Sequence, residues 1–506
     1  MKRKFLAKAI TLGLMLAVPL GAQAADNLKY AQGIVINNVD SKTVGDVNGD
    51  VNLSLDIPVT NFANLNNNID YIVGIANVTG DNSIVMDSAN ISNTNFVTNA
   101  KQAEIAGIFN LQGRTTINKD VNIKLSGEDK NETPGLGIFG IRTFWHTRYN
   151  EESGKYEPDK DDKISKISIA GNTKIDISGK AAYLAGILLQ DNEGTELTLG
   201  ENTDIKVTDT SKNGSENLYG INLPFMDQAT KKSEIKGNNI KIELNGGMKQ
   251  LGFSGANGDV EIRDLDIRLN DASVEAKGIS VGESYSSHYC TTKIGNLSIY
   301  IANSAKDKKE NFSAIVLSCN NSLTVSGNVK LDVENGYAIK TGFWSNKQYL
   351  NNDLALGNDD GSKTVQIKGD ILSSEDGSGT IKLNLNNSNS YFTGTNTGKT
   401  DIVLKDGAAW TNTGASTVTN LDINGATLVQ GSADAAITKF TKNNPNNSHR
   451  QFTIAGNNTI ALNTTSDGST MKSTKNLFAE DAFDTVDENT TIKLTSANQN
   501  ASNIIK

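Results

Sequence analysis

Short apolar runs in which a small residue precedes a large apolar one recur along most of this chain. Their spacing varies from 24 to 46 residues, which does not fit a helical array of fixed period but fits coils with loops of variable length. We therefore expect one coil of a parallel β-solenoid per recurrence. The ten recurrences are Gly33-Ile34, Gly74-Ile75, Gly107-Ile108, Gly140-Ile141, Gly186-Ile187, Gly220-Ile221, Gly252-Phe253, Gly278-Ile279, Ala314-Ile315 and Ala338-Ile339.

Two alternating segments follow each of the better-defined runs. After Gly186, for example, aliphatic and polar residues alternate over 196–199 and again over 204–207. Alternation with period two is typical of strands with one buried face, so the aliphatic side chains would form one continuous interior. Clusters of Gly, Asn, Asp and Ser between these segments suit tight corners. The pattern predicts an all-β protein, a single parallel β-helix with three short strands per coil.

Length and composition agree with one elongated domain. A chain of 506 residues would ordinarily suggest several globular domains, but it contains only 6 prolines and no Pro-rich or Gly/Ser-rich linker interrupts the repeat. A solenoid avoids the size limit of a compact core because it grows along one axis.

The N-terminus predicts export. A basic segment precedes the apolar run 9–18, and Ala22-Gln23-Ala24 has the small residues that a signal peptidase requires. The run is shorter than the roughly 18 apolar residues of a membrane span. We expect cleavage after Ala24 and no integral membrane span in the mature chain.

The charge of the mature chain argues against a nucleic-acid partner. The formal net charge of −9 becomes −13 when the four basic residues of the signal peptide are removed. No basic stripe offsets this excess of negative charge, and nucleic acids bind chiefly to positive surfaces. The four residues are Lys2, Arg3, Lys4 and Lys8.

The two cysteines predict a disulfide. Cys290 and Cys319 are 29 residues apart, close to one coil, and each lies just ahead of an alternating segment. Equivalent positions in adjacent coils are about 4.8 Å apart, which is within the reach of a disulfide. An exported chain can form this bond. The alternative is two unpaired thiols.

The C-terminal third contains a more specific pattern. Residues 381–394 alternate and end in Ser390-Tyr391-Phe392-Thr393-Gly394, and an aliphatic segment follows at 402–404. Next comes a Trp-x-x-x-Gly-x-Ser-x-Val-x-x-Leu segment that runs from Trp410 to Leu421. This order of segments, over about residues 380–430, resembles the end of pertactin-like autotransporter passenger domains.

The resemblance implies a type V secreted passenger, a right-handed parallel β-helix displayed on the cell surface. It also implies a stabilising C-terminal cap, which a solenoid end needs to avoid open-edge pairing. The expected divisions are a signal peptide over 1–24, a β-helix passenger over 25–379 and cap-like coils over 380–506. Residues with structural roles in the cap would be Leu383, Leu385, Trp410, Val418 and Leu421.

The chain departs from the autotransporter pattern at its C-terminus. Autotransporters continue into a linker helix and a membrane β-barrel, whereas this sequence stops at Lys506 without barrel-like strands. A truncated passenger without independent activity and a stand-alone passenger are both open. A stand-alone passenger would reach the cell surface or medium through a separate outer-membrane translocator, and would be periplasmic without one.

Large side chains, most of them aromatic, gather in segments that follow four of the recurrences, those at Gly140, Gly220, Gly278 and Ala338. Because a solenoid stacks equivalent positions, these loops should leave along one edge. Aromatic and arginine side chains on loops held by a rigid scaffold are typical of binding sites, although they could instead cover the corners of the solenoid. The candidate binding residues are Phe144, Trp145, Arg148, Tyr149, Tyr285, Tyr289, Phe343, Trp344 and Tyr349.

No segment of the sequence fully matches a motif for a cofactor or a metal. Residues 135–140 spell a dinucleotide-binding fingerprint, but Gly140 is itself a recurrent strand glycine and no helix follows. Residues 46–50 begin like a calcium loop, yet Val51 and Ile57 replace the required Gly and Glu. The three histidines are scattered. We expect no cofactor and no metal.

The sequence favours a non-catalytic adhesin or interaction stalk with a host-surface glycan or protein as partner. The alternative is a β-helix carbohydrate-active enzyme, a polysaccharide lyase or glycosidase. Such an enzyme needs paired carboxylates, or Asp with Arg or Lys, on one face. Most carboxylates here lie at outward positions of alternating segments, where a solvated face explains them.

Overall fold

The structure is a computed structural model, and the chain divides into two compact units, Met1–Ile279 and Ser280–Lys506. Each unit is treated by itself below. The residues that the structure describes are 34–36, 49–55, 70–77, 83–98, 103–110, 113–131, 135–143, 147–150, 155–158, 164–190, 194–211, 217–224, 232–255, 258–282, 290–302, 309–318, 321–341, 352–373, 379–440, 451–466, 471–473, 475–478, 485–486 and 488–497.

Three sets of strands recur in the same order along the first unit. Set A contains the recurrent glycine, and comprises β1 (Ile34–Ile36), β3 (Asp70–Asn77), β7 (Ala103–Asn110), β10 (Leu136–Thr143), β15 (Tyr183–Leu189), β18 (Asn217–Leu223) and β20 (Lys249–Gly255). Set B comprises β4 (Ser83–Met86), β8 (Arg114–Ile117), β13 (Ser165–Ile169), β16 (Thr195–Thr198) and the first halves of β19 (Ser233–Asn245) and β21 (Gly258–Asn270). Set C comprises β2 (Asp50–Ser54), β5 (Ser88–Ser92), β9 (Val121–Asp129), β14 (Thr173–Lys180), β17 (Asn202–Asp209) and the second halves of β19 and β21.

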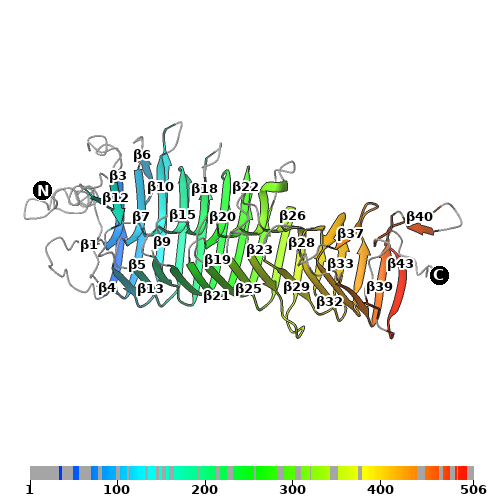
Figure 1. Cartoon of the computed structure of the whole chain (residues 1–506). Helices are drawn as coiled ribbons and strands as arrows, with labels where there is room; N and C mark the ends of the chain where they lie inside the picture. The colour runs from blue at the N-terminus through cyan, green and yellow to red at the C-terminus, as the bar shows by residue number, and fades with distance from the viewer. Residues whose placement is uncertain are drawn as a thin grey trace, which may run out of the picture. The chain divides into compact units, whose positions relative to one another are not determined.

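Each strand pairs in parallel with its counterpart in the next coil. In set A, Ile141 of β10 is the register partner of Ile108 in β7 and of Ile187 in β15. The register continues from Ile187 to Ile221 in β18. Figure 1 shows β10, β15 and β18 side by side. The predicted parallel β-helix is therefore confirmed, and the strands of this unit follow one another as A, B and C in each coil.

The recurrent glycines are explained by close packing inside the coil. A Cβ atom at Gly186 would lie 2.3 Å from Ile205 Cγ2 and 2.8 Å from the Gly220 carbonyl oxygen. Gly140 and Gly220 make the same approach to Ile175 and Ile242, which are likewise in set C. At each of these glycines, the branched side chain of an isoleucine and the backbone of the next coil occupy the space that a Cβ atom would need.

Replacing Gly186 with alanine is expected to lower the free energy of unfolding by about 1–3 kcal/mol, because the added methyl overpacks the interior. Denaturant unfolding measures the loss. Changing Ile205 to leucine in the Gly186→Ala background should restore part of it, since leucine lacks the Cγ2 branch that meets the new methyl. Equal losses for the single and the double variant would contradict this packing.

The second unit repeats the same plan. Its set A strands are β24 (Phe312–Leu317), the end of β26 (Val329–Thr341), the end of β28 (Val365–Leu372), β31 (Asn396–Thr397), β34 (Ala415–Val418) and β37 (Ala436–Phe440). Set B comprises the start of β23 (Cys290–Ile301), β25 (Asn321–Val325), β27 (Asn352–Leu356), β29 (Ile381–Leu385), β32 (Asp401–Lys405), β35 (Asn420–Asn424), β38 (Gln451–Ala455) and β42 (Thr485–Val486). Set C comprises the end of β23, the start of β26, the start of β28, β30 (Tyr391–Thr393), β33 (Ala409–Asn412), β36 (Thr427–Gln430), β39 (Asn457–Leu462) and β43 (Thr491–Ser496).

Residues 380–430 form a well-packed part of the second unit. Trp410 is fully buried, stacks on Phe392 with ring centroids 5.5 Å apart, and donates its Nε1–H to the Gly394 carbonyl oxygen at 3.1 Å. The other residues expected to be structural here are buried as well, namely Leu383, Leu385, Val418 and Leu421. Among the described residues, no helix has the length and hydropathy of a membrane span.

Candidate functional site

The corners of the coil differ in length. In the first unit the corner between sets B and C is short, as at 118–120 and 170–172. The corner between sets A and B holds longer segments, among them 144–164 and 224–232. In the second unit the segment 342–351 occupies the same corner, between β26 and β27. These three connections therefore start where set A strands end.

The register places these starting points at one edge of the first unit. Thr143, the last residue of β10, is the partner of Leu189, and Leu223 of β18 is the partner of Gly255. We call this boundary the A edge, defined by Thr143, Leu189, Leu223 and Gly255. It is the part of the fold from which the predicted binding loops of this unit depart.

Most of the predicted binding residues lie outside the described residues. Arg148 and Tyr149 belong to β11 (Thr147–Asn150), whose backbone pairs antiparallel with β12 (Lys155–Pro158). In this separate two-stranded sheet Arg148 is the register partner of Glu157, and Tyr149 of Tyr156. The binding role of the set remains a prediction. The residues outside the described parts are Phe144, Trp145, Tyr285, Tyr289, Phe343, Trp344 and Tyr349.

An apolar cluster lies next to the A edge, on set A of the first unit. Phe139 has Ala106 and Ala185 as register partners, so one large ring lies between two small side chains. Phe139, the two alanines and Leu188 form a buried cluster against which Phe109 and Tyr219 pack. Outward positions of a solenoid are normally solvated, yet Phe139 is only 4% exposed.

A buried ion pair belongs to the same region. The Arg142 guanidinium lies over the Phe139 ring, 4.5 Å from its centroid, and pairs with the Glu104 carboxylate. The Arg142 side chain is 6% exposed and that of Glu104 is 23% exposed. A charge in apolar surroundings is costly unless it is paired. Sequence reasoning missed this pair because its members are 38 residues apart and meet only through the coil register.

The outer face of set C in the first unit has a different chemistry. Charges alternate in sign from strand to strand. Lys206 Nζ and Glu243 Oε1, for example, form an ion pair at 3.3 Å. Hydrogen bonding from Asn245, followed by Lys206, lowers the pKa of Glu243. The face therefore has no strong field of one sign. The charged residues form two columns of register partners. The first is Lys124, Asp176, Lys206, Glu243 and Arg268, and the second is Lys174, Asp204, Lys241 and Asp266.

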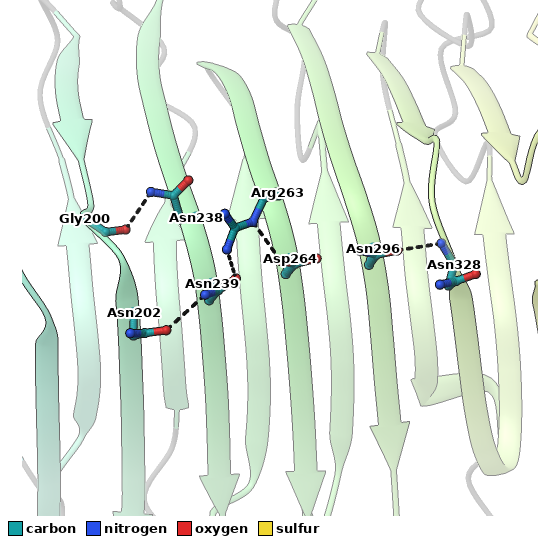
Figure 2. Close-up of polar contacts among 8 residues, drawn as sticks. All are labelled: Gly200, Asn202, Asn238, Asn239, Arg263, Asp264, Asn296 and Asn328. Carbon is teal, nitrogen blue, oxygen red and sulfur yellow. Dashed lines mark hydrogen bonds and ion pairs between the residues drawn. The ribbon is translucent and has the colours of Figure 1, made fainter. Parts of the chain in front are cut away.

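Asparagines form a ladder at the corner between sets B and C (Figure 2). Asn239 Nδ2 donates to Asn202 Oδ1 at 3.0 Å, and Asn202 Nδ2 donates to Asn172 Oδ1 at 2.8 Å. Arg263 ends the ladder, because its guanidinium donates to both Asn239 Oδ1 and Asp264 Oδ2. In the second unit the Asn328 N–H donates to Asn296 Oδ1 at 2.8 Å. These bonds fix the register of successive coils, which makes the ladder a structural feature.

Burial raises the pKa of one carboxylate, that of Asp401. Asp401 of β32 accepts a hydrogen bond of 2.7 Å from Asn420 Nδ2, and burial raises its pKa above the ordinary 3.8. A raised pKa means that the folded state binds the proton more tightly than the unfolded state does. Asp401 therefore favours folding below pH 3.8 and progressively less as the pH rises through its folded-state pKa.

Replacing Asp401 with asparagine is expected to raise the melting temperature at pH 7. The variant removes the partly desolvated charge and keeps an oxygen that can accept from Asn420. The advantage should shrink as the pH falls to about 3, where the wild-type carboxyl is protonated. Thermal scans from pH 3 to 8 measure this difference, and a gain that is independent of pH would contradict the assignment.

Only one cysteine of the predicted disulfide lies in the described part of the chain. Cys290 is buried at the start of β23, with Asn321 of β25 as its register partner. Cys319 lies outside the described residues, two positions before Asn321, so the bond stays a prediction. Mass spectrometry of the unreduced mature chain should show the loss of two hydrogens; an intact mass without that loss would indicate two thiols.

Within the described residues, no group of three or more His, Cys, Asp or Glu side chains could hold a metal ion. Comparisons with known proteins give no further assignment. No family model matches the chain, and no curated protein or solved structure matches it.

Proposed function

We propose that this chain is an exported, surface-displayed β-helical passenger that acts by contact, as an adhesin or interaction stalk. The single observation that carries the proposal is the difference between the faces of the first unit. The outer face of set C carries paired charges of alternating sign, whereas set A carries a buried apolar cluster and ends at the A edge, where the connection 144–164 begins. Recognition is usually carried by loops on a rigid scaffold.

The family assignment is part of the same proposal. The pattern from Ser390 to Leu421 supports a pertactin-like passenger, and the parallel β-helix is the fold that such a passenger requires. Export by a signal peptide over 1–24 is also part of the proposal. The proposed partner is a glycan or protein of a host surface, bound through aromatic side chains near the A edge.

Binding of the mature chain to cultured host cells and to a glycan array tests the proposal. A variant with Trp145, Tyr149 and Trp344 changed to alanine should bind about tenfold more weakly or worse, because aromatic anchors carry much of an interface's binding energy. The matched control changes Lys174, Lys206 and Lys241 on set C to alanine and should bind normally. Unchanged binding of the aromatic variant would overturn the proposal.

A further inference from the structure

We propose that the outer face of set C in the second unit binds an uncharged glycan chain. The face, called the neutral strip here, belongs to β30, β33 and β36 and continues on β39. It is made of two register columns, Tyr391, Ala409 and Thr427 in one and Thr393, Thr411 and Val429 in the other. This site is separate from the A edge of the first unit.

The strand alternation places the neutral strip on the outside. Phe392, Trp410 and Leu428 are fully buried, so the residues that alternate with them face away from the interior. Tyr391 is 38% exposed, one of the few large apolar side chains that the described residues present to solvent. Its register partner Ala409 is small. One side of the ring therefore has only a methyl group beside it.

Charged outward residues of set C lie beside both ends of the neutral strip but not on it. Lys368 of β28, which pairs with Asp332 at 3.0 Å, is the register partner of Thr393. Thr459 of β39 is the register partner of Lys493 in β43. Between these lysines, the outward positions of β30, β33, β36 and β39 carry no charge. The contrast with the alternating charges of the first unit's set C is clear.

An uncharged glycan fits this chemistry better than other ligands. A polyanion would find no cation on the strip, and a charged peptide would lose hydration without gaining a partner. A sugar offers an apolar face to the Tyr391 ring and hydroxyls to the threonines. Strands about 4.8 Å apart place uncharged side chains at regular intervals along the strip, which suits an extended polymer.

The test is binding of the full mature chain to an array of neutral homo-oligosaccharides of glucose, mannose and galactose, with uronic-acid and sialylated glycans on the same array. At least one neutral series should bind. Tyr391→Ala and Thr411→Lys should each weaken that binding about tenfold, the effect of losing one ring contact or of placing a charge on the strip. Tyr391→Phe should retain it.

The matched control is Ser178→Lys, an outward position of set C in the first unit, which should bind like the wild type. Melting temperatures close to the wild-type value show that each variant is folded, as expected for outward positions. No binding to any neutral glycan, a preference for the acidic glycans, or full binding by Thr411→Lys would each overturn the proposal. The variant with Trp145, Tyr149 and Trp344 changed to alanine should bind the neutral series normally, which separates this site from the proposed adhesin surface.

Discussion

Replacing Trp410 with alanine is expected to cost about 3–5 kcal/mol of unfolding free energy, as large aromatic deletions from a packed core do. Three losses add together. The buried indole leaves a cavity, its stack on Phe392 disappears, and the Gly394 carbonyl oxygen loses its Nε1–H donor. Trp410 is also the register partner of Leu428, so the damage should extend into the next coil.

Hydrogen exchange locates this loss. Amides of β30, β33 and β36 should exchange faster in the Trp410→Ala variant, while those of β10, β15 and β18 in the first unit stay protected. Trp410→Phe is the matched control, because it keeps a ring beside Phe392 and loses mainly the hydrogen bond, at a cost of about 1–2 kcal/mol. Equal destabilisation by alanine and phenylalanine would contradict the packing described for this region.

Replacing Arg142 with methionine is expected to cost about 2–3 kcal/mol. Removal of one partner from a buried ion pair leaves the other charge uncompensated, and the partial exposure of Glu104 moderates the penalty. The variant also loses the contact of the guanidinium with the Phe139 ring. Denaturant unfolding at neutral pH measures the change.

Two further variants separate charge from packing. Combining Arg142→Met with Glu104→Leu should recover most of the stability, because an apolar pair of similar volume avoids the desolvation of both charges. Lys119→Met breaks the exposed pair with Asp87 and should have no measurable effect. A double variant as unstable as Arg142→Met would show that the ion pair is not the cause.

The strands were predictable because their pattern is local. The alternation over 196–199 and 204–207 corresponds to β16 and β17, and the Gly186-Ile187 run lies in β15. The reason for the glycine itself was not accessible. It depends on Ile205 and on the Gly220 carbonyl oxygen, which reach Gly186 only when successive coils are stacked.

Polar residues of the interior and of set A were the least predictable. Asn77 and Asn110 are buried and donate to the Arg114 and Gly113 carbonyl oxygens near the corners, although alternation alone would assign asparagine to a solvated face. Arg142 looks like an ordinary outward charge, and only the pairing of β7 with β10 brings the Glu104 side chain within its reach. The predicted binding residues, by contrast, lie mainly outside the described part of the chain.

The A edge and the neutral strip both depend on the register of the coils, so a direct test of that register is the most informative measurement. Ser178 of β14 and Thr208 of β17 are register partners on set C. Cysteines at these two positions should form a disulfide on mild oxidation, seen as a linked peptide pair by mass spectrometry, because parallel partners lie about 4.8 Å apart. A pair shifted by one residue, Ser178→Cys with Val207→Cys, should stay unlinked, since Val207 faces the interior. Linkage of the shifted pair in place of the matched one would contradict the stacked coils.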